Sequence, residues 1–92
     1  MLIEKIGDAA MLEQTAEECA ELAQACLKYA RALRMENPTP KPMHEIIANI
    51  EEETADVSLC LTELSRGKLI CDSNVMKWME IKNERIQRRF ET

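Results

Sequence analysis

The sequence predicts an all-α protein, an antiparallel helical bundle of three to four helices that is completed by oligomerisation. Only two glycines and three prolines occur among its 92 residues, and good helix formers such as Ala, Leu, Glu, Met, Lys and Arg dominate. Apolar residues recur at helical spacing in three long segments. A chain this short buries only a small core by itself, so we expect a partner subunit, in a homodimer or homotetramer, to complete it.

The first half of the chain is divided by two breaks. Residues 1–6 are expected to form one or two helical turns that stop at Gly7, and Asp8 is a suitable N-cap for the next helix. No glycine or proline interrupts residues 9–35, so one helix is expected there. The three prolines within residues 37–42 end it, because proline cannot continue a helix.

The second half of the chain is expected to contain two helices. The first covers about residues 43–65, with Gly67 as its predicted C-cap. Asp72 or Ser73 is expected to cap a last helix that runs to about residue 90. No repeat, low-complexity segment or composition shift divides the sequence, so residues 1–92 are predicted to be a single domain.

One apolar stripe is predicted along each long helix. The first stripe is built mainly from small residues, which implies a close neighbouring helix: Leu12, Ala16, Cys19, Ala23, Cys26, Leu27 and Ala30. The second consists of Ile46, Ile50, Val57, Cys60, Leu61 and Leu64, and the third of Val75, Met79, Ile86 and Phe90. The four cysteines show no CxxC spacing, so Cys19, Cys26 and Cys60 are predicted to be small core residues.

Charge and hydropathy exclude several classes of protein. The net charge is −5 and the isoelectric point is about 4.9, which argues against a nucleic-acid binder. No apolar run approaches the ~20 residues of a membrane span, and the N-terminus lacks a signal-peptide pattern. We therefore expect a cytoplasmic protein without a membrane or nucleic-acid partner.

Carboxylates on two predicted helices are the strongest sign of a site. Glu53 falls inside the second apolar stripe, where a charge is costly unless a cation or a donor meets it. Asp56 follows three residues later, and Glu18 and Glu21 have the same spacing on the preceding helix. If the helices pack antiparallel, the four carboxylates can converge. Such oxygen ligands suit Mg²⁺ or Mn²⁺, whereas no Cys/His set for zinc is present.

A solvated helix face is the alternative explanation of this pattern. A single pair of glutamates three residues apart is ordinary on a helix surface. Two pairs, one of them with a carboxylate in an apolar stripe, leave a solvated face and a cation site as open alternatives.

The motifs resemble the all-α nucleoside triphosphate pyrophosphohydrolases, the MazG-like superfamily. Residues 17–22 read EECAEL and residues 52–57 read EETADV, similar to the EExxE and ExxD motifs of that family. Residues 83–90 read NERIQRRF, similar to its NExxxRRF ending. The resemblance implies a Mg²⁺-dependent enzyme, with Mn²⁺ as the alternative ion. It would hydrolyse a nucleoside triphosphate between the α- and β-phosphates.

The resemblance also implies roles for individual residues. Glu18, Glu21, Glu53 and Asp56 would bind one or two ions, and Glu17, beside these ligands, would be the general base or orient a ligand. Lys82, Asn83 and Arg85, on the last helix, would contact substrate phosphates. Two alternatives remain: the same fold acting on dUTP, dCTP or phosphoribosyl-ATP, and a non-catalytic metal-binding helical oligomer.

Overall fold

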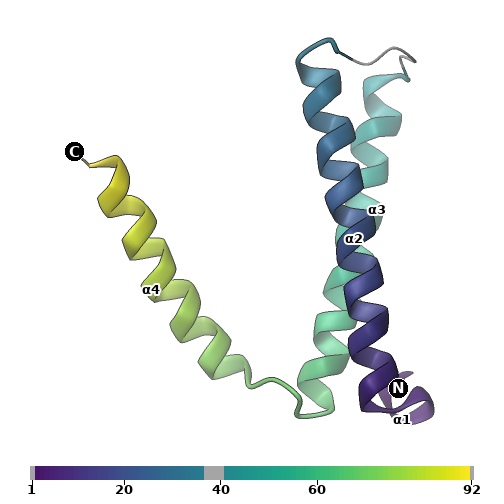
Figure 1. Ribbon diagram of the computed structural model, residues 1–92, viewed down its shortest axis with the longest axis vertical. Helices are drawn as coiled ribbons and strands as arrows, with labels where there is room; N and C mark the ends of the chain where they lie inside the picture. Colours follow the sequence, from purple (N-terminus) through teal and green to yellow (C-terminus); the bar gives the residue numbers. More distant parts are fainter. Residues whose placement is uncertain (1, 37–40, 92) are drawn as a thin grey trace.

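The computed structural model describes residues 2–36 and 41–91. These residues form four α-helices and no strands: α1 (Leu2–Ile6), α2 (Asp8–Leu33), α3 (Met43–Arg66) and α4 (Asp72–Phe90). The predicted all-α class is confirmed. Helices α2 and α3 pack against each other as an antiparallel hairpin, α1 lies at its lower end, and α4 leaves that end and diverges from the hairpin (Figure 1). Residues 37–40, which carry two of the three prolines in the predicted break, lie outside the described residues.

The core lies where α1 meets the lower end of the hairpin. Ile3, Met11, Cys60 and Leu64 are buried together there, and Leu69 and Ile70 of the α3–α4 connector pack against them. The carboxylate of Glu63 accepts a hydrogen bond from the backbone N–H of Leu2 and so satisfies one free donor at the start of α1. The small α1 is therefore held by both apolar and polar contacts.

Two predicted N-caps differ from the structure, whereas the predicted C-cap is confirmed. Gly7, with a φ of 90°, is the N-cap of α2, and Asp8 is already the first helical residue. Cys71 is the N-cap of α4 in place of the expected Asp72 or Ser73, because α4 already begins at Asp72. Gly67 is the C-cap of α3 as predicted, with a φ of −77°. The next residue, Lys68, adopts the left-handed conformation with a φ of 61°, and the N–H of Leu69 then donates to the carbonyl of Leu64.

Gly67 leaves space that the side chain of Ile3 occupies. A Cβ at this position would collide with Cδ1 of Ile3, at a separation far below any ordinary contact. The glycine therefore lets the end of α3 approach the buried side chain of α1 closely.

The structure confirms most of the predicted apolar stripe of α3 but not that of α2. The α3 stripe is confirmed for most of its members, since all but the exposed Leu61 are buried or half-buried. The α2 prediction is wrong for the single chain, because six of its seven members are exposed and only Ala30 is half-buried. The face of α2 that packs within the chain instead carries Met11, Thr15 and Ala25.

The burial of these cysteines matches the burial of the apolar stripe on which each lies. Cys19 and Cys26 belong to the α2 stripe and are exposed, so the prediction that they are core residues is wrong for the single chain. Cys60 belongs to the α3 stripe and is buried, as the sequence predicted.

Helix α4 does not pack on the hairpin. None of its residues is buried, including the predicted stripe of Val75, Met79, Ile86 and Phe90. The radius of gyration is 16.7 Å, whereas a compact chain of this length has roughly 12 Å. The expected bundle is thus reduced to a two-helix hairpin within one chain. No helix in the described part of the chain is long and apolar enough to cross a membrane.

The fit between Gly67 and Ile3 can be tested by a double-mutant cycle. Gly67→Ala is expected to cost about 1–3 kcal/mol of unfolding free energy, because the added methyl overpacks the core. Ile3→Val removes the clashing Cδ1 and alone should cost about 0.5–1.5 kcal/mol. The clash disappears in the double variant. Its loss of unfolding free energy, measured by urea denaturation, should therefore be clearly smaller than the sum of the losses of the two single variants. Additive losses would contradict the close contact.

Candidate metal centre

Four carboxylates meet in the seam between α2 and α3. Glu18 and Glu21 come from α2, and Glu53 and Asp56 from α3. Each offers one oxygen, and these four oxygens all lie within 4.8 Å of one another. Because each pair is spaced by three residues, both members point to one side of their helix, and the antiparallel packing then brings the two pairs together. The predicted convergence is confirmed as an acidic cluster.

The cluster is partly removed from water. Glu18, Glu53 and Asp56 are half-buried, and Glu21 is exposed. One oxygen of Glu18 and one of Glu53 are buried and have no hydrogen-bond partner among the described residues. Buried carboxylate oxygens are normally satisfied by a donor or a cation. The two unsatisfied oxygens therefore indicate that the cluster is suited to a cation.

Electrostatics in the cluster favour a proton or a positive ion. Burial raises the pKa of Glu53 above the ordinary 4.5, and the neighbouring carboxyl groups of Glu21, Asp56 and Glu18 raise it further. Burial likewise raises the pKa of Glu18, partly opposed by the hydrogen bond that it accepts from Gln14, and the charges of Glu21 and Asp56 add to the increase. Like charges at short range disfavour the fully ionised state.

Two further polar residues, one beside the cluster and one at the α1 end of the hairpin, have roles that were not predicted from the sequence. Gln14 lies one turn before Glu18 and donates from Nε2 to its Oε1 at 2.8 Å, which holds that carboxylate in place. Glu63 is half-buried and binds the first turn of α1. The spacing of four residues between Gln14 and Glu18 is a usable sequence signal, whereas the role of Glu63 depends on a residue 61 positions away.

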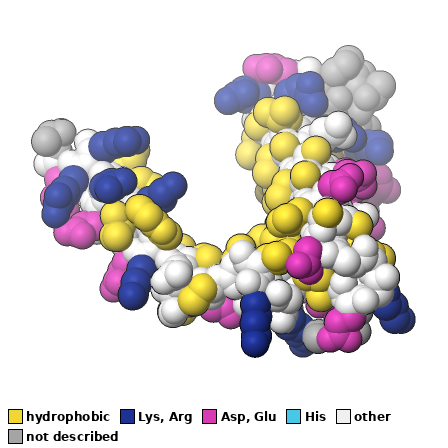
Figure 2. All heavy atoms as spheres, turned by 60° about the horizontal axis from the view of Figure 1, so that its bottom comes forward, with side chains coloured by type: hydrophobic (Ala, Val, Ile, Leu, Met, Phe, Trp, Pro, Cys, Tyr) yellow, Lys and Arg dark blue, Asp and Glu magenta, His cyan; other side chains and the backbone are white. Residues whose placement is uncertain are grey.

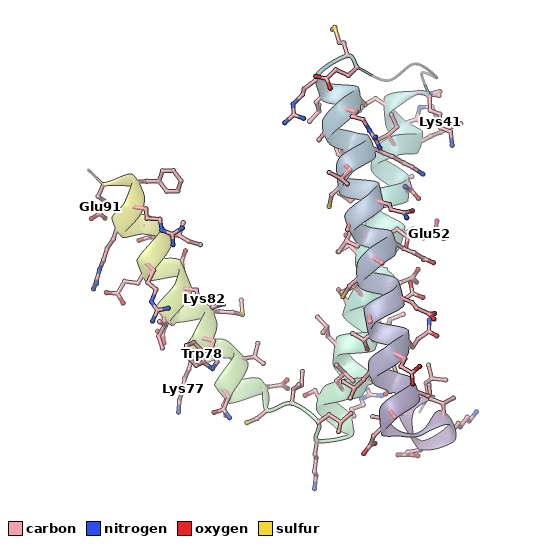
Figure 3. The ribbon with its side chains drawn as sticks, viewed as in Figure 1. Lys41, Glu52, Lys77, Trp78, Lys82 and Glu91 are labelled. Carbon is pink, nitrogen blue, oxygen red and sulfur yellow. The ribbon has the colours of Figure 1, made fainter. Side chains whose placement is uncertain are left out.

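The other predicted site residues lie outside the cluster. Glu17 is exposed on α2, beside Glu18 in sequence. Lys82, Asn83 and Arg85 are exposed on α4. Figure 3 shows Lys82 on this diverging helix, away from the hairpin. Within one copy of the chain, the three α4 residues are therefore not brought to the carboxylates.

Comparison with known proteins does not assign this chain to a family. No family model, curated protein or solved structure matches this chain. The similarity to the MazG-like enzymes accordingly remains a resemblance of three short motifs, and a function has to be inferred from the cluster itself.

The raised pKa values predict a pH dependence of stability. A raised carboxyl pKa in the folded state contributes stability that is present below the unfolded value of 4.5 and is lost as the pH rises through the folded value. Without divalent ions, the wild type should therefore lose stability relative to Glu53→Gln as the pH rises from 4.5 towards neutrality. Urea denaturation at a series of pH values, with exposed Glu51→Gln as the control, would measure this difference. A stability difference between the wild type and Glu53→Gln that does not vary with pH would contradict this prediction.

Ion binding is testable by thermal unfolding. Mg²⁺ or Mn²⁺ should raise the melting temperature of the wild type, since a ligand at ~100 times its Kd stabilises a folded protein by about 2.7 kcal/mol. Glu53→Gln should lose most of this increase, because it removes one of the four carboxylates, whereas Glu51→Gln should retain it. Equal increases in all three proteins would show that the ion binds elsewhere.

Proposed function

We propose that this protein is a Mg²⁺-dependent nucleotide pyrophosphohydrolase that converts a (deoxy)nucleoside triphosphate and water into a nucleoside monophosphate and pyrophosphate. The observation that carries the proposal is the cluster of Glu18, Glu21, Glu53 and Asp56, whose ligand oxygens lie within 4.8 Å of one another. The motif resemblance of α2, α3 and α4 to the MazG-like enzymes supplies the reaction type.

The donor set fits a hard divalent cation. Mg²⁺ binds oxygen ligands at about 2.0–2.1 Å in an octahedron, so opposite ligands lie about 4.2 Å apart. The carboxylate oxygens, all within 4.8 Å of one another, are near this span, and rotation of the side chains can bring them closer around an ion. Four carboxylates on two helices also leave room for water and phosphate oxygens on the exposed side of Glu21.

Side chains of the protein and a bound metal ion would each contribute to hydrolysis. When bound, Mg²⁺ neutralises triphosphate charge and lowers the pKa of a coordinated water. The packing of α2 against α3 brings the four carboxylates to one place, where they would hold the ion. Glu17 is exposed next to Glu18, which suits a base that takes a proton from water or orients a ligand. The water adds across the bond between the α- and β-phosphates, and pyrophosphate leaves.

Phosphate contacts by Lys82, Asn83 and Arg85 are part of the proposal. Guanidinium and ammonium groups neutralise phosphate oxygens that the metal does not reach. Because these residues lie on α4, away from the carboxylates of their own chain, such contacts require α4 to approach a cluster by another route. dUTP, dCTP and phosphoribosyl-ATP are alternative substrates with the same phosphate chemistry.

A non-catalytic role is the second candidate. The unsatisfied buried oxygens of Glu18 and Glu53 would also be satisfied by a structural cation that holds α2 and α3 together. This alternative predicts ion binding without hydrolysis, so it is separated from the enzyme by an activity assay.

The assay measures pyrophosphate released from a panel of nucleoside triphosphates with Mg²⁺ or Mn²⁺. We expect metal-dependent release by the wild type. Glu53→Gln should lower kcat/KM by at least about 100-fold, a loss typical of damaged metal sites, without unfolding the protein. Glu51→Gln, outside the cluster, should keep near-wild-type activity.

Two outcomes would count against the enzyme. Absence of pyrophosphate release from every substrate would refute the hydrolase, and metal-dependent melting in the same sample would then favour the structural role. Activity that survives Glu53→Gln unchanged would move the reaction away from this cluster.

A further inference from the structure

One of the four cluster carboxylates has a hydrogen-bond donor on its own helix. Nε2 of Gln14 donates to Oε1 of Glu18 at 2.8 Å, and both side chains are half-buried on α2. An ionised carboxylate only accepts hydrogen bonds, so the amide nitrogen of Gln14, and not its amide oxygen, faces Glu18. The hydrogen bond therefore engages one of the two oxygens that Glu18 could offer to an ion.

The other oxygen of Glu18 has no such partner. Oε2 is buried and accepts no hydrogen bond from the described residues. Gln14 precedes Glu18 by one turn of α2, whereas Glu21 follows it by about one turn. The hydrogen bond thus holds Oε1 on the Gln14 side, and Oε2 is the oxygen free to meet an ion. Turning the carboxylate to present both oxygens would cost the hydrogen bond.

The matching position on α3 shows what the length of the Gln14 side chain contributes. Each helix carries an amide, a glutamate and a second acid at spacings of four and three: Gln14, Glu18 and Glu21 on α2, and Asn49, Glu53 and Asp56 on α3. Asn49 is half-buried, but its amide is one methylene closer to the backbone. The described part of the chain shows no hydrogen bond between Asn49 and Glu53. Glutamine reaches the carboxylate one turn ahead, whereas asparagine does not.

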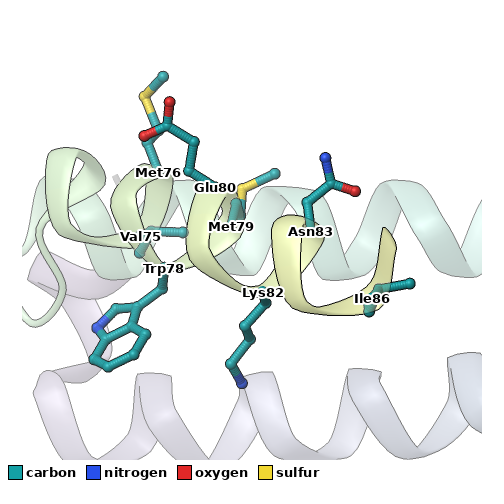
Figure 4. A pocket seen from close by; sticks show the side chains of 8 residues that line it. All are labelled: Val75, Met76, Trp78, Met79, Glu80, Lys82, Asn83 and Ile86. Atoms are coloured by element: carbon teal, nitrogen blue, oxygen red, sulfur yellow. The ribbon is translucent and has the colours of Figure 1, made fainter. Parts of the chain in front are cut away.

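The basic side chains of α4 lie away from the cluster within one copy. Helix α4 carries five Lys/Arg, and several of them gather on this helix, apart from the hairpin (Figure 2). Lys82 and Asn83 border a groove of about 960 Å³ along α4 and point to different sides of the helix (Figure 4). The restraint on Glu18 therefore comes from Gln14, within the hairpin itself.

The number of oxygens that a carboxylate presents distinguishes one cation from another. Ca²⁺ takes about 6–8 oxygen ligands at about 2.3–2.6 Å, and carboxylates bind it through one or both oxygens. Mg²⁺ demands a near-ideal octahedron at about 2.0–2.1 Å, which the narrow bite of a two-oxygen carboxylate does not suit. A carboxylate restricted to one oxygen thus favours the smaller ion.

We propose that Gln14 is a positioning residue that limits Glu18 to one ligand oxygen, Oε2, and thereby favours a small octahedral cation such as Mg²⁺ or Mn²⁺ over Ca²⁺ at the cluster. The proposal rests on the proposed function only in placing an ion among these carboxylates, and it applies to a catalytic and to a structural ion alike. Without the hydrogen bond, Glu18 can offer both oxygens to a larger ion.

The first experiment measures the Kd of Mn²⁺ and of Ca²⁺ by titration calorimetry, without nucleotide, for the wild type and Gln14→Met. Methionine is similar in length and a good helix former, but it has no N–H donor. The Kd of Mn²⁺ should rise by about 10–100-fold, as when other hydrogen-bond partners of metal ligands are removed. The Kd of Ca²⁺ should rise much less, so the preference for Mn²⁺ over Ca²⁺ should fall at least about tenfold.

Two further variants separate the hydrogen bond from a general disturbance of the hairpin. Gln14→Asn keeps the amide but shortens the side chain, and it should lose the preference for Mn²⁺ as Gln14→Met does. Asn49→Met removes the amide at the matching position of α3, and it should keep the wild-type preference. A merely structural role of Gln14 would weaken the binding of both ions alike.

Infrared difference spectra, recorded with and without Ca²⁺, give a second readout. The antisymmetric and symmetric stretches of a carboxylate lie closer together when both oxygens bind an ion than when one does. Bands with the smaller separation should therefore be stronger in Gln14→Met than in the wild type.

Several results would overturn the proposal: an unchanged preference in Gln14→Met, an equal loss of preference in Asn49→Met, identical carboxylate bands in wild type and Gln14→Met, or a wild type that binds neither ion. None of these measurements requires hydrolysis. A changed preference in a protein that releases no pyrophosphate would refute the hydrolase and leave the role of Gln14 intact. An active enzyme with an unchanged preference would refute the role of Gln14 alone.

Discussion

The seam between α2 and α3 contains like charges, and this constraint shapes the rest of the molecule. Glu18 and Glu53 each bury one carboxylate oxygen without a partner among the described residues, with Glu21 and Asp56 beside them. Their mutual repulsion disfavours the closed hairpin at neutral pH unless a cation is present. Apolar contacts elsewhere must hold the two helices together.

Those contacts lie on both sides of the acidic seam: Ala25 and Ile46 are buried on one side of it, and the largest buried cluster lies on the other. Ile3, Met11, Cys60 and Leu64 form the buried cluster, and the connector residues Leu69 and Ile70 extend it. The small α1 contributes more than its length suggests, because it brings Ile3 against the end of α3, where Gly67 leaves space. The carboxylate cluster lies next to this core, since the charges of Glu18 and Asp56 contribute to the raised pKa of the buried Cys60 thiol.

Buried apolar residues therefore flank the candidate site. The largest cluster of them lies at the end of the hairpin where α1 packs and from which α4 leaves (Figure 1). Apolar side chains on α2 and α4 remain exposed outside this core.

Local patterns in the sequence were enough to predict the all-α class, the approximate helix bounds and the four carboxylates of the cluster. Each depends on spacing alone: helix formers without interruption, proline and glycine at the breaks, and acidic pairs three residues apart. The buried face of α2 could not be predicted in this way, because two faces of that helix carry apolar residues. Met11, Thr15 and Ala25 are buried within the chain, and the predicted stripe is left exposed. The position of α4 depends on Lys68, Leu69 and Ile70, which fix the connector. Periodicity predicts that a helix has an apolar face, but packing alone determines which surface covers it.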